Sequence, residues 1–411
     1  MNIFSGIWVL VYCNALISSG YALSMPFFAV YLSVERGLPM SLTGAFLSIS
    51  MLSGALANGL GGELSDTLGR RKVMLFALVS RCIFTALMAL AIHDRAAYAW
   101  LLALHMAGGF FGMFFGPAAQ AWIADHSGPR ERLEHFGLLR IGGNLGWALG
   151  PMIGGLVASK SYALMFAITS MVYGVCSLVV FFCVEESSGR TGRRARLSDM
   201  LMELKVPRFA RLCTLGFIIS TVMSQLVVGL SLYCMKYLHY SQHQVGMLFS
   251  VNGFVVVFFQ YSVSRLMKRT RISGAMAVGA LLYALGYGIV GFSNIFLWTA
   301  TGILLLSFGE TAVSPGLTTL GSNIAPQGRK GRYLGMQALV QQTGSSFGIF
   351  LGGNGMEMLA PSWQQGPWVL IVLIALCAAL GFYGMKKHLL PEEDGIKDFP
   401  LPLHPDKEAE I

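Results

Sequence analysis

Long apolar segments recur along the whole chain and are separated by short polar segments. A helix needs about 20 consecutive apolar residues to span the hydrocarbon core of a bilayer. The apolar runs are continuous and do not alternate with polar residues, so they argue against a transmembrane β-barrel. The pattern predicts an all-α membrane protein with helix cores at 7–33, 40–62, 72–92, 97–123, 136–158, 162–184, 211–238, 244–266, 273–292, 295–321, 334–358 and 366–385.

The first apolar run is too long for a signal peptide, and the first basic residue along the chain is Arg36. A signal peptide carries its positive charge before the apolar stretch, so we expect this run to be a retained helix.

Composition supports the membrane assignment, because 55% of the 411 residues are hydrophobic and only 12% are charged. A typical soluble domain has roughly 25% charged residues, so an ordinary soluble enzyme is excluded, as is a disordered chain. The net charge of +9 would indicate nucleic acid binding in a soluble protein. Here the basic residues lie in loops between apolar segments, and we expect no nucleic acid partner. The seven cysteines lie in apolar segments without a CxxC pair, which predicts small buried hydrophobes and no metal.

Charge in the loops predicts the orientation. Most of the 29 Lys and Arg residues lie after the even-numbered spans, whereas the intervening loops hold only Arg36, Arg95, Lys160 and Lys236. Cytoplasmic loops carry the excess of Lys and Arg, so both termini are predicted to be cytoplasmic.

The basic segment 185–210 divides the chain. We expect an N-terminal six-helix bundle over 1–184, a cytoplasmic central loop over 185–210, a C-terminal six-helix bundle over 211–386 and a cytoplasmic tail over 387–411. The tail from Pro391 onward is acidic and rich in proline, and it is expected to be poorly ordered.

The two halves resemble each other. A shift of 198 residues aligns Pro117 with Pro315 and Gly137 with Gly335, and four further glycines of the first half also meet glycines. Either generic small-residue packing or an internal repeat could produce these matches. The repeat predicts two pseudo-symmetric bundles, an architecture in which transporters place the substrate site between the repeats.

The segment 62–72 reads Gly-Glu-Leu-Ser-Asp-Thr-Leu-Gly-Arg-Arg-Lys. It resembles the G-x-L-x-D-x-x-G-R-R loop of the major facilitator superfamily, and the resemblance extends to the twelve spans and the long central loop. It implies a cytoplasmic gating motif, with Asp125 as the partner of the motif's arginine and Gly335 as the residue that lets Gly62 approach. The motif residues are Gly62, Asp66, Gly69, Arg70 and Arg71.

The fifth span carries a second motif, which resembles the G-x8-G-x3-G-P-x2-G-G pattern of drug:proton antiporters in the same superfamily. Its residues are Gly137, Gly146, Gly150, Pro151, Gly154 and Gly155. Glycines flatten one face of a helix for close packing, and proline bends it. The resemblance implies that this face seals the interface between the bundles, and it favours export over uptake.

The fourth span departs from the family. Many such antiporters carry R-x-x-Q-G there, whereas this chain has His105 in place of the arginine and Gly108 in place of the glutamine. A histidine titrates near neutral pH and could carry the proton, or it could be a packed neutral histidine.

Charged residues inside spans are costly and therefore candidates for function. Glu310 is the clearest acid in a helix core and is the predicted site of proton coupling and substrate recognition, and His105 is the second candidate for this role. Arg81, in the third span, either reaches the interface with its charged end or binds an anion. In this superfamily the first, fourth, seventh and tenth spans line the cavity. The resemblance therefore implies further cavity residues on these spans, namely Asn14, Ser18, Tyr21, Phe111 and Gln225.

Together with these patterns, the resemblance implies a secondary active exporter in the cell (inner or plasma) membrane, which exchanges amphipathic or lipophilic small molecules for protons by alternating access. Export of one dedicated metabolite, siderophore or lipid is the alternative. A channel or membrane-embedded enzyme fits less well, because filter repeats, clustered catalytic groups and a Walker A motif are absent from the sequence. The expected partners are the substrate, protons and membrane lipids; we expect a monomer without cofactor.

Overall fold

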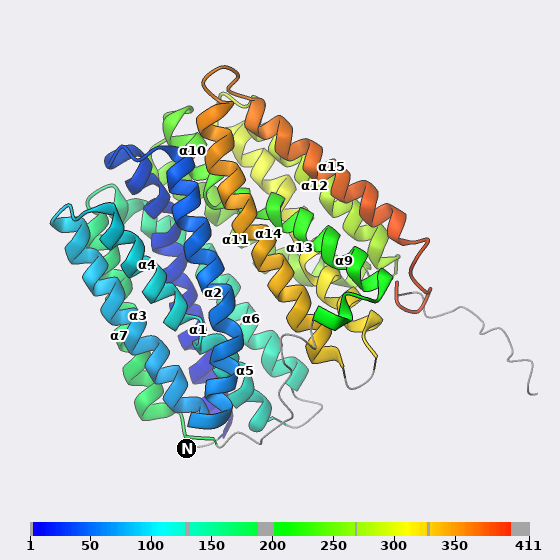
Figure 1. Cartoon of the computed structure of the whole chain (residues 1–411), viewed down its shortest axis with the longest axis horizontal. Helices are drawn as coiled ribbons and strands as arrows, with labels where there is room; N and C mark the ends of the chain where they lie inside the picture. Colours follow the sequence, from blue (N-terminus) through cyan, green and yellow to red (C-terminus); the bar gives the residue numbers. More distant parts are fainter. Residues whose placement is uncertain (1–2, 128–131, 188–200, 268, 327–328, 396–411) are drawn as a thin grey trace, which may run out of the picture.

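A computed structural model describes residues 3–127, 132–187, 201–267, 269–326 and 329–395 (Figure 1). Every regular element in this part of the chain is a helix. The first half contains α1 (Ile3–Val30, continued by the π-helix Tyr31–Glu35), α2 (Met40–Leu68), α3 (Arg70–His93), α4 (Tyr98–Gly112), α5 (Phe115–Asp125), α6 (Arg132–Ala158) and α7 (Tyr162–Cys183). The second half contains α9 (Pro207–Met223), a short 3-10 helix (Ser224–Leu226), α10 (Gly229–Lys236), α11 (Gln242–Met267), α12 (Ile272–Phe292), α13 (Phe296–Ile324), α14 (Lys330–Met358) and α15 (Gly366–Met385).

Ten helical segments of the described chain are long and apolar enough to span a bilayer. Helix α14, at the eleventh expected span, is not among them, and at the second expected span the described apolar stretch of α2 is the shorter Met40–Gly54. Helix α14 carries polar residues along its length, and it packs against α2, so these side chains need not face lipid. The chain is therefore a multi-pass helical membrane protein.

Two of the expected spans are interrupted. The fourth breaks between Gly112 and Phe115, where α4 ends and α5 begins. The seventh breaks between Met223 and Gly229, where the 3-10 helix joins α9 to α10. A broken helix exposes backbone groups that would be costly in lipid, and such breaks are tolerated where protein surrounds them.

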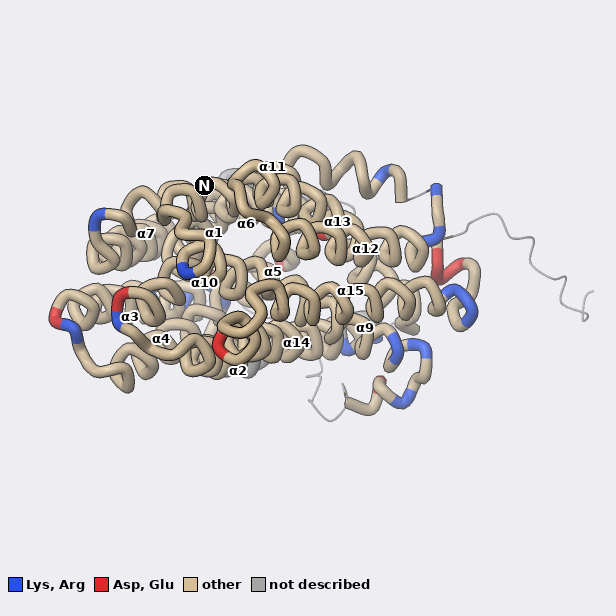
Figure 2. The backbone as a smooth tube through the Cα atoms, turned by 90° about the horizontal axis from the view of Figure 1, so that it is seen from above, with Lys and Arg blue, Asp and Glu red and all other residues tan. Residues whose placement is uncertain are grey.

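Helices α1–α7 lie together, and helices α9–α15 lie beside them (Figure 1). We call them the first and second helix groups. Charged residues lie mostly at helix ends and turns, while the helix bodies are largely uncharged (Figure 2). We call the end that holds Gly69, Glu186 and Asp394 the clasp end, and the other end, which holds Gly37 and His239, the far end.

The two groups meet closely along two helix pairs. In α2 and α14, a Cβ on Gly44 would lie 2.9 Å from Gly353 Cα, and Ser48 Oγ donates to the Ser346 carbonyl at 2.7 Å. Both contacts lie in the half of α2 nearer the far end. Towards the clasp end, α2 and α14 diverge (Figure 1).

Helices α6 and α11 form the second pair. A Cβ on Gly155 would lie 2.5 Å from the Gln242 carbonyl oxygen, and Gly246 faces the Pro151 carbonyl oxygen in the same way. Glycine on both helices allows their backbones to approach where a side chain would hold them apart.

The described cysteines are all free thiols. The expectation that all are buried is wrong for Cys377, which is exposed on α15, and Cys82 and Cys183 are only partly buried.

Candidate functional site

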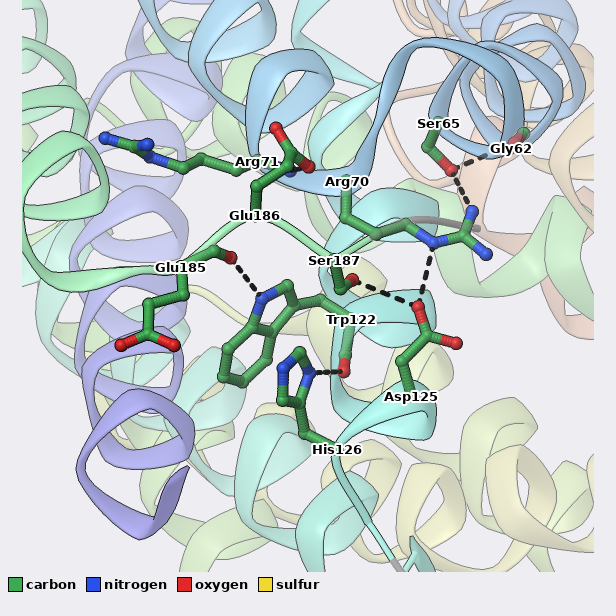
Figure 3. Close-up of polar contacts among 10 residues, drawn as sticks. All are labelled: Gly62, Ser65, Arg70, Arg71, Trp122, Asp125, His126, Glu185, Glu186 and Ser187. Carbon is green, nitrogen blue, oxygen red and sulfur yellow. Dashed lines mark hydrogen bonds and ion pairs between the residues drawn. The ribbon is translucent and has the colours of Figure 1, made fainter. Parts of the chain in front are cut away.

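An ion pair at the clasp end joins three helices (Figure 3). The Arg70 side chain is buried, and its Nε lies 3.2 Å from Asp125 Oδ2 at the end of α5. Its Nη1 donates to Ser65 Oγ of α2 at 2.8 Å. A buried cation is costly unless it is paired and hydrogen-bonded, and these two partners meet that need. The pair that the motif implies between Arg70 and Asp125 is therefore present.

Glu186 caps the N-terminus of α3 (Figure 3). Its carboxylate accepts hydrogen bonds from the backbone amides of Arg71, at 2.9 Å, and Lys72, at 3.3 Å. The first amides of a helix lack partners within the helix, and a negative charge beside them is favourable. The preceding Gly69 has a φ of 104°, a conformation that favours glycine.

Residues 185–187 form what we call the first clasp. Besides the Glu186 cap, the Glu185 carbonyl accepts a hydrogen bond from Trp122 Nε1 of α5 at 2.8 Å, and Ser187 Oγ donates to Asp125 Oδ2 at 3.1 Å (Figure 3). The segment that follows α7 is thus fastened to both α3 and α5.

Residues 393 and 394 form a second clasp in the other helix group. The buried Asp394 carboxylate accepts from the Ser273 amide and hydroxyl, both at 2.7 Å, at the start of α12. The Glu393 carbonyl accepts from Asn323 Nδ2 of α13 at 2.8 Å, and the Glu393 carboxylate pairs with Arg208 at 2.9 Å. The expectation of poor order from Pro391 onward is therefore wrong up to Gly395, because two buried carboxylates hold this segment in place.

Other parts of the gating motif do not meet as expected. A Cβ on Gly62 would have Pro117 of α5 as its nearest neighbour, at 3.9 Å, and no atom of Gly335 lies within the 4 Å around it. The expected approach of Gly335 to Gly62 is thus not found in this structure, where α2 and α14 diverge. The Asp66 side chain lies outside the described part of the chain. Arg71 lies with its guanidinium 5.0 Å from the centre of the Phe181 ring and donates to the Phe181 carbonyl.

The glycines of the second motif line α6, but most of them face α1 within the first helix group. A Cβ on Gly146, Gly150 or Gly154 would collide with the backbone of α1. Gly155 alone among these faces α11 of the second group, and a Cβ on Gly137 would meet nothing within 4 Å. The expectation that this face seals the interface between the bundles is wrong for Gly146, Gly150 and Gly154. The helix continues through Pro151, whose carbonyl faces α11.

Glu310 lies midway along α13 and is held by a residue of α11. Asn252 Nδ2 donates to Glu310 Oε2 at 2.9 Å and to Ser307 Oγ at 3.0 Å. Arg140, on α6 of the first helix group, donates to Ser314 of α13 at 3.3 Å, about one helical turn from Glu310. The acid thus lies where the two groups meet, with a cation from the opposite group nearby.

His105 lies apart from Glu310, in a cavity of about 60 Å³ inside the first helix group. Its ring packs 4.9 Å from the Phe28 ring and 6.2 Å from the Phe46 ring. Tyr21 and Arg81 line the same cavity. Of the predicted site residues, the structure therefore brings His105 and Tyr21 together.

The other predicted cavity residues make contacts elsewhere. Asn14 Nδ2 donates to the Leu139 carbonyl of α6 at 2.8 Å, and Ser18 lies against Gly143 and Gly146 of α6. Gln225 is buried, and its Nε2 donates to the Gly348 carbonyl of α14 at 2.6 Å, which ties the break in the seventh span to α14. Phe111 packs in an aromatic cluster with Phe76, Phe84, Phe110 and Phe114. None of these four residues lines the cavity that holds His105.

Sequence reasoning missed Asn252, Glu186 and Asp394. Asn252 could have been found as a polar residue within the eighth span. The two clasp acids stand just after apolar runs and looked like ordinary solvated residues.

Comparison with known proteins agrees with the fold. A family model described as Major Facilitator Superfamily matches residues 10–349 and 212–407. Quinolone resistance protein NorA of Staphylococcus aureus is 25% identical, over 93% of this chain and 97% of that protein. Multidrug resistance protein MdtH of Aeromonas salmonicida is 22% identical, over 91% of this chain and 94% of that protein. Among solved structures, a D-xylose–proton symporter has a TM-score of 0.75 at 16% identity, over 96% of this chain and 99% of the symporter.

Proposed function

The chain belongs to the Major Facilitator Superfamily, and from this we propose that it is a secondary active exporter. It moves amphipathic or lipophilic small molecules across the cell membrane in exchange for protons. Two similar proteins are named for resistance to quinolones and to multiple drugs, which supports efflux as the direction.

We propose that the two helix groups are pseudo-symmetric bundles, with both termini in the cytoplasm. The two clasps support this arrangement. In each clasp the first acid accepts through its carbonyl from a side chain at the end of α5 or α13. The second acid caps α3 or α12 with its carboxylate. With the termini inside, the clasp end is cytoplasmic, and the divergence of α2 and α14 there corresponds to a state open to the cytoplasm. Alternating access would follow from rocking of one bundle against the other.

The observation that supports proton coupling is the position of Glu310, an acid in the middle of a spanning helix. An ionised carboxylate is costly in such a place unless it is paired. Here the Asn252 amide holds it, and Arg140 of the other group binds Ser314 one turn along α13. When protonated, the acid needs no cation and releases Arg140. When ionised, it attracts Arg140 and draws the two groups together. Proton binding thereby favours one conformation over the other, which exchange requires.

Purified protein in liposomes, with a pH gradient imposed across the membrane, tests the proposal. The probe is the compound whose accumulation in cells falls most on expression in a screen of toxic compounds. We expect Glu310→Gln to abolish uphill movement driven by the gradient while exchange of labelled for unlabelled probe persists. Glu392→Gln removes an exposed acid and should leave uphill movement unchanged. Uphill movement by Glu310→Gln at the wild-type rate would contradict this coupling site.

A further inference from the structure

The cavity in the first helix group has one charged side chain among its lining residues, Arg81 of α3. The walls come from α1, α2, α3, α4 and α7, so this cavity lies within one group and apart from Glu310. Its volume of about 60 Å³ is several times the roughly 10–15 Å³ that one water needs, so it has room for more than a single water.

Arg81 has aromatic neighbours and no acidic partner in the described chain. Its guanidinium lies 5.2 Å from the centre of the Tyr21 ring and 4.8 Å from that of Tyr173. No ion pair joins Arg81 to a carboxylate in the described residues. The acids nearest in the sequence, Asp66 and Asp94, stand at the ends of helices, away from the middle of α3. The positive charge of Arg81 therefore has no counter-ion in the described residues. A cation inside a span is costly unless it is paired, so a ligand with a negative charge would be favourable here.

The chain makes room for this guanidinium. A Cβ on Gly112 would lie 2.7 Å from Arg81 Cδ and 3.1 Å from its Nε. Gly112 is the last residue of α4, where the fourth span is interrupted. Any larger residue there would displace the Arg81 side chain. The position of the Arg81 guanidinium therefore depends on a glycine at the break in the fourth span.

A second unmatched polar group faces the same cavity. The Ser50 side chain of α2 is buried, and its hydroxyl has no hydrogen-bond partner in the described structure. An unpaired buried hydroxyl costs about 1–3 kcal/mol. A ligand with negatively charged oxygens would satisfy both groups. Its oxygens would pair with the guanidinium and accept a hydrogen bond from the hydroxyl.

The remaining walls are largely apolar and include Met25, Phe28, Met51, Phe84 and Met88. Such walls suit the hydrophobic part of a ligand next to its charged group. We propose that this cavity binds the carboxylate or sulfonate of an amphipathic organic anion, with Arg81 as counter-ion and Ser50 as hydrogen-bond donor. That this anion is the exported substrate rests on the proposed function, whereas the binding site itself does not.

Equilibrium dialysis of the full chain in phosphatidylcholine nanodiscs tests the site, with 2-naphthoate as probe and the neutral 2-naphthamide as its matched analogue. We expect naphthoate to bind about tenfold or more tightly than the amide, because a charge-assisted hydrogen bond is stronger than a neutral one. Arg81→Gln should reduce naphthoate binding to the level of the amide. Arg265→Gln removes an exposed arginine of α11 and should change neither affinity.

Ser50→Leu provides a second variant that leaves Arg81 in place and fills the cavity from α2, and it should also abolish naphthoate binding. It keeps the test decisive if Arg81→Gln does not fold. Equal affinities for naphthoate and naphthamide, or wild-type naphthoate binding in either variant, would overturn the proposal. A second set of nanodiscs that also contains phosphatidylglycerol tests for a lipid site. Loss of naphthoate binding in these nanodiscs would overturn the proposal, since the cavity would then bind the lipid headgroup.

The dialysis uses no pH gradient, so its result is independent of the liposome test of export. Arg81-dependent naphthoate binding without uphill movement of any compound would support the site and contradict only the proposed export. Uphill export of neutral compounds without naphthoate binding would overturn the site alone.

Discussion

At the scale of single residues, two carboxylates hold helix starts at the clasp end, and they differ in burial. Asp394 is fully buried, and its carboxylate accepts two hydrogen bonds from Ser273. Glu186 is exposed to a larger degree, although it accepts from two backbone amides. When a buried acceptor is lost, its donors cannot bond to water instead and remain unpaired. The more deeply buried cap should therefore contribute more to the free energy of unfolding.

We therefore expect Asp394→Ala to lower stability more than Glu186→Ala. Loss of a helix cap costs about 0.5–2 kcal/mol, and Glu186→Ala should fall at the low end of that range. Asp394→Ala should reach or exceed the high end, because Ser273 remains buried without its acceptor. Thermal unfolding in detergent, followed by tryptophan fluorescence, measures both changes. Equal midpoints for the two variants would contradict the argument from burial.

At the scale of elements, α6 serves two interfaces. One face packs on α1 through Gly146, Gly150 and Gly154, and another packs on α11 at Gly155. The six-residue motif therefore fixes α6 within its own group first, and only one of its glycines takes part in the contact between groups.

Gly154→Ala tests the packing on α1. A Cβ there would collide with the Leu23 carbonyl, and forcing extra atoms into a packed contact costs typically 1–3 kcal/mol. We expect a lower thermal midpoint in detergent. Gly137→Ala is the matched control from the same motif, because nothing lies within 4 Å of its Cβ position and alanine favours the helix. A lower midpoint for Gly137→Ala than for Gly154→Ala would be incompatible with this assignment.

Helix positions followed from hydrophobicity, because an apolar run of sufficient length has few alternatives to a spanning helix. The third expected core, 72–92, lies inside α3 (Arg70–His93). The breaks in the fourth and seventh spans did not follow, since they depend on which residues of other helices lie beside them. Gly112 ends α4 where Arg81 needs room, and no local pattern marks this.

Contacts between residues far apart in the sequence were the part of the site that was hardest to predict. The Arg70–Asp125 pair could be expected because a motif carries it. Glu186 is separated from Arg71 by 115 positions, and nothing in either segment indicates that they meet. For a related reason, the sequence does not show where Asn14 and Ser18 make their contacts. Helical periodicity places Asn14 and Ser18 on one face, but it does not reveal that α6 covers that face.

At the scale of the whole molecule, the contact between α2 and α14 holds the far end together. Besides the approach of Gly44 and Gly353, the Glu357 carboxylate accepts from the Met40 amide at 2.8 Å. A conformation that opens the far end must separate these residues.

Gly353→Leu should therefore favour conformations in which the far end is open, because the new side chain meets the backbone of α2. Destabilising the closed contact by about 1.4 kcal/mol changes the ratio of the two states roughly tenfold. Spin labels at the exposed positions Leu42 and Met358 would report a longer distance in electron paramagnetic resonance, after replacement of the native cysteines.

Gly384→Leu on α15 is the control, since nothing lies within 4 Å of its Cβ position. It should leave the distance distribution unchanged. An unaltered distribution in Gly353→Leu would mean that the α2–α14 contact does not govern opening of the far end.

The positions of the two clasps set an order for biosynthesis. Glu186 directly follows α7, so the first helix group has all of its fastening residues as soon as residue 187 has been synthesised, before α9 exists. The second group must wait for Asp394, which is made after every helix that it fastens. During translation the first group can therefore finish in the membrane as a closed unit, while α12 stays uncapped until Asp394 emerges. A premature stop just before Glu393 would leave the first group unchanged. The second group would have all of its helices but would lack the contacts of Glu393 and Asp394 that fasten them.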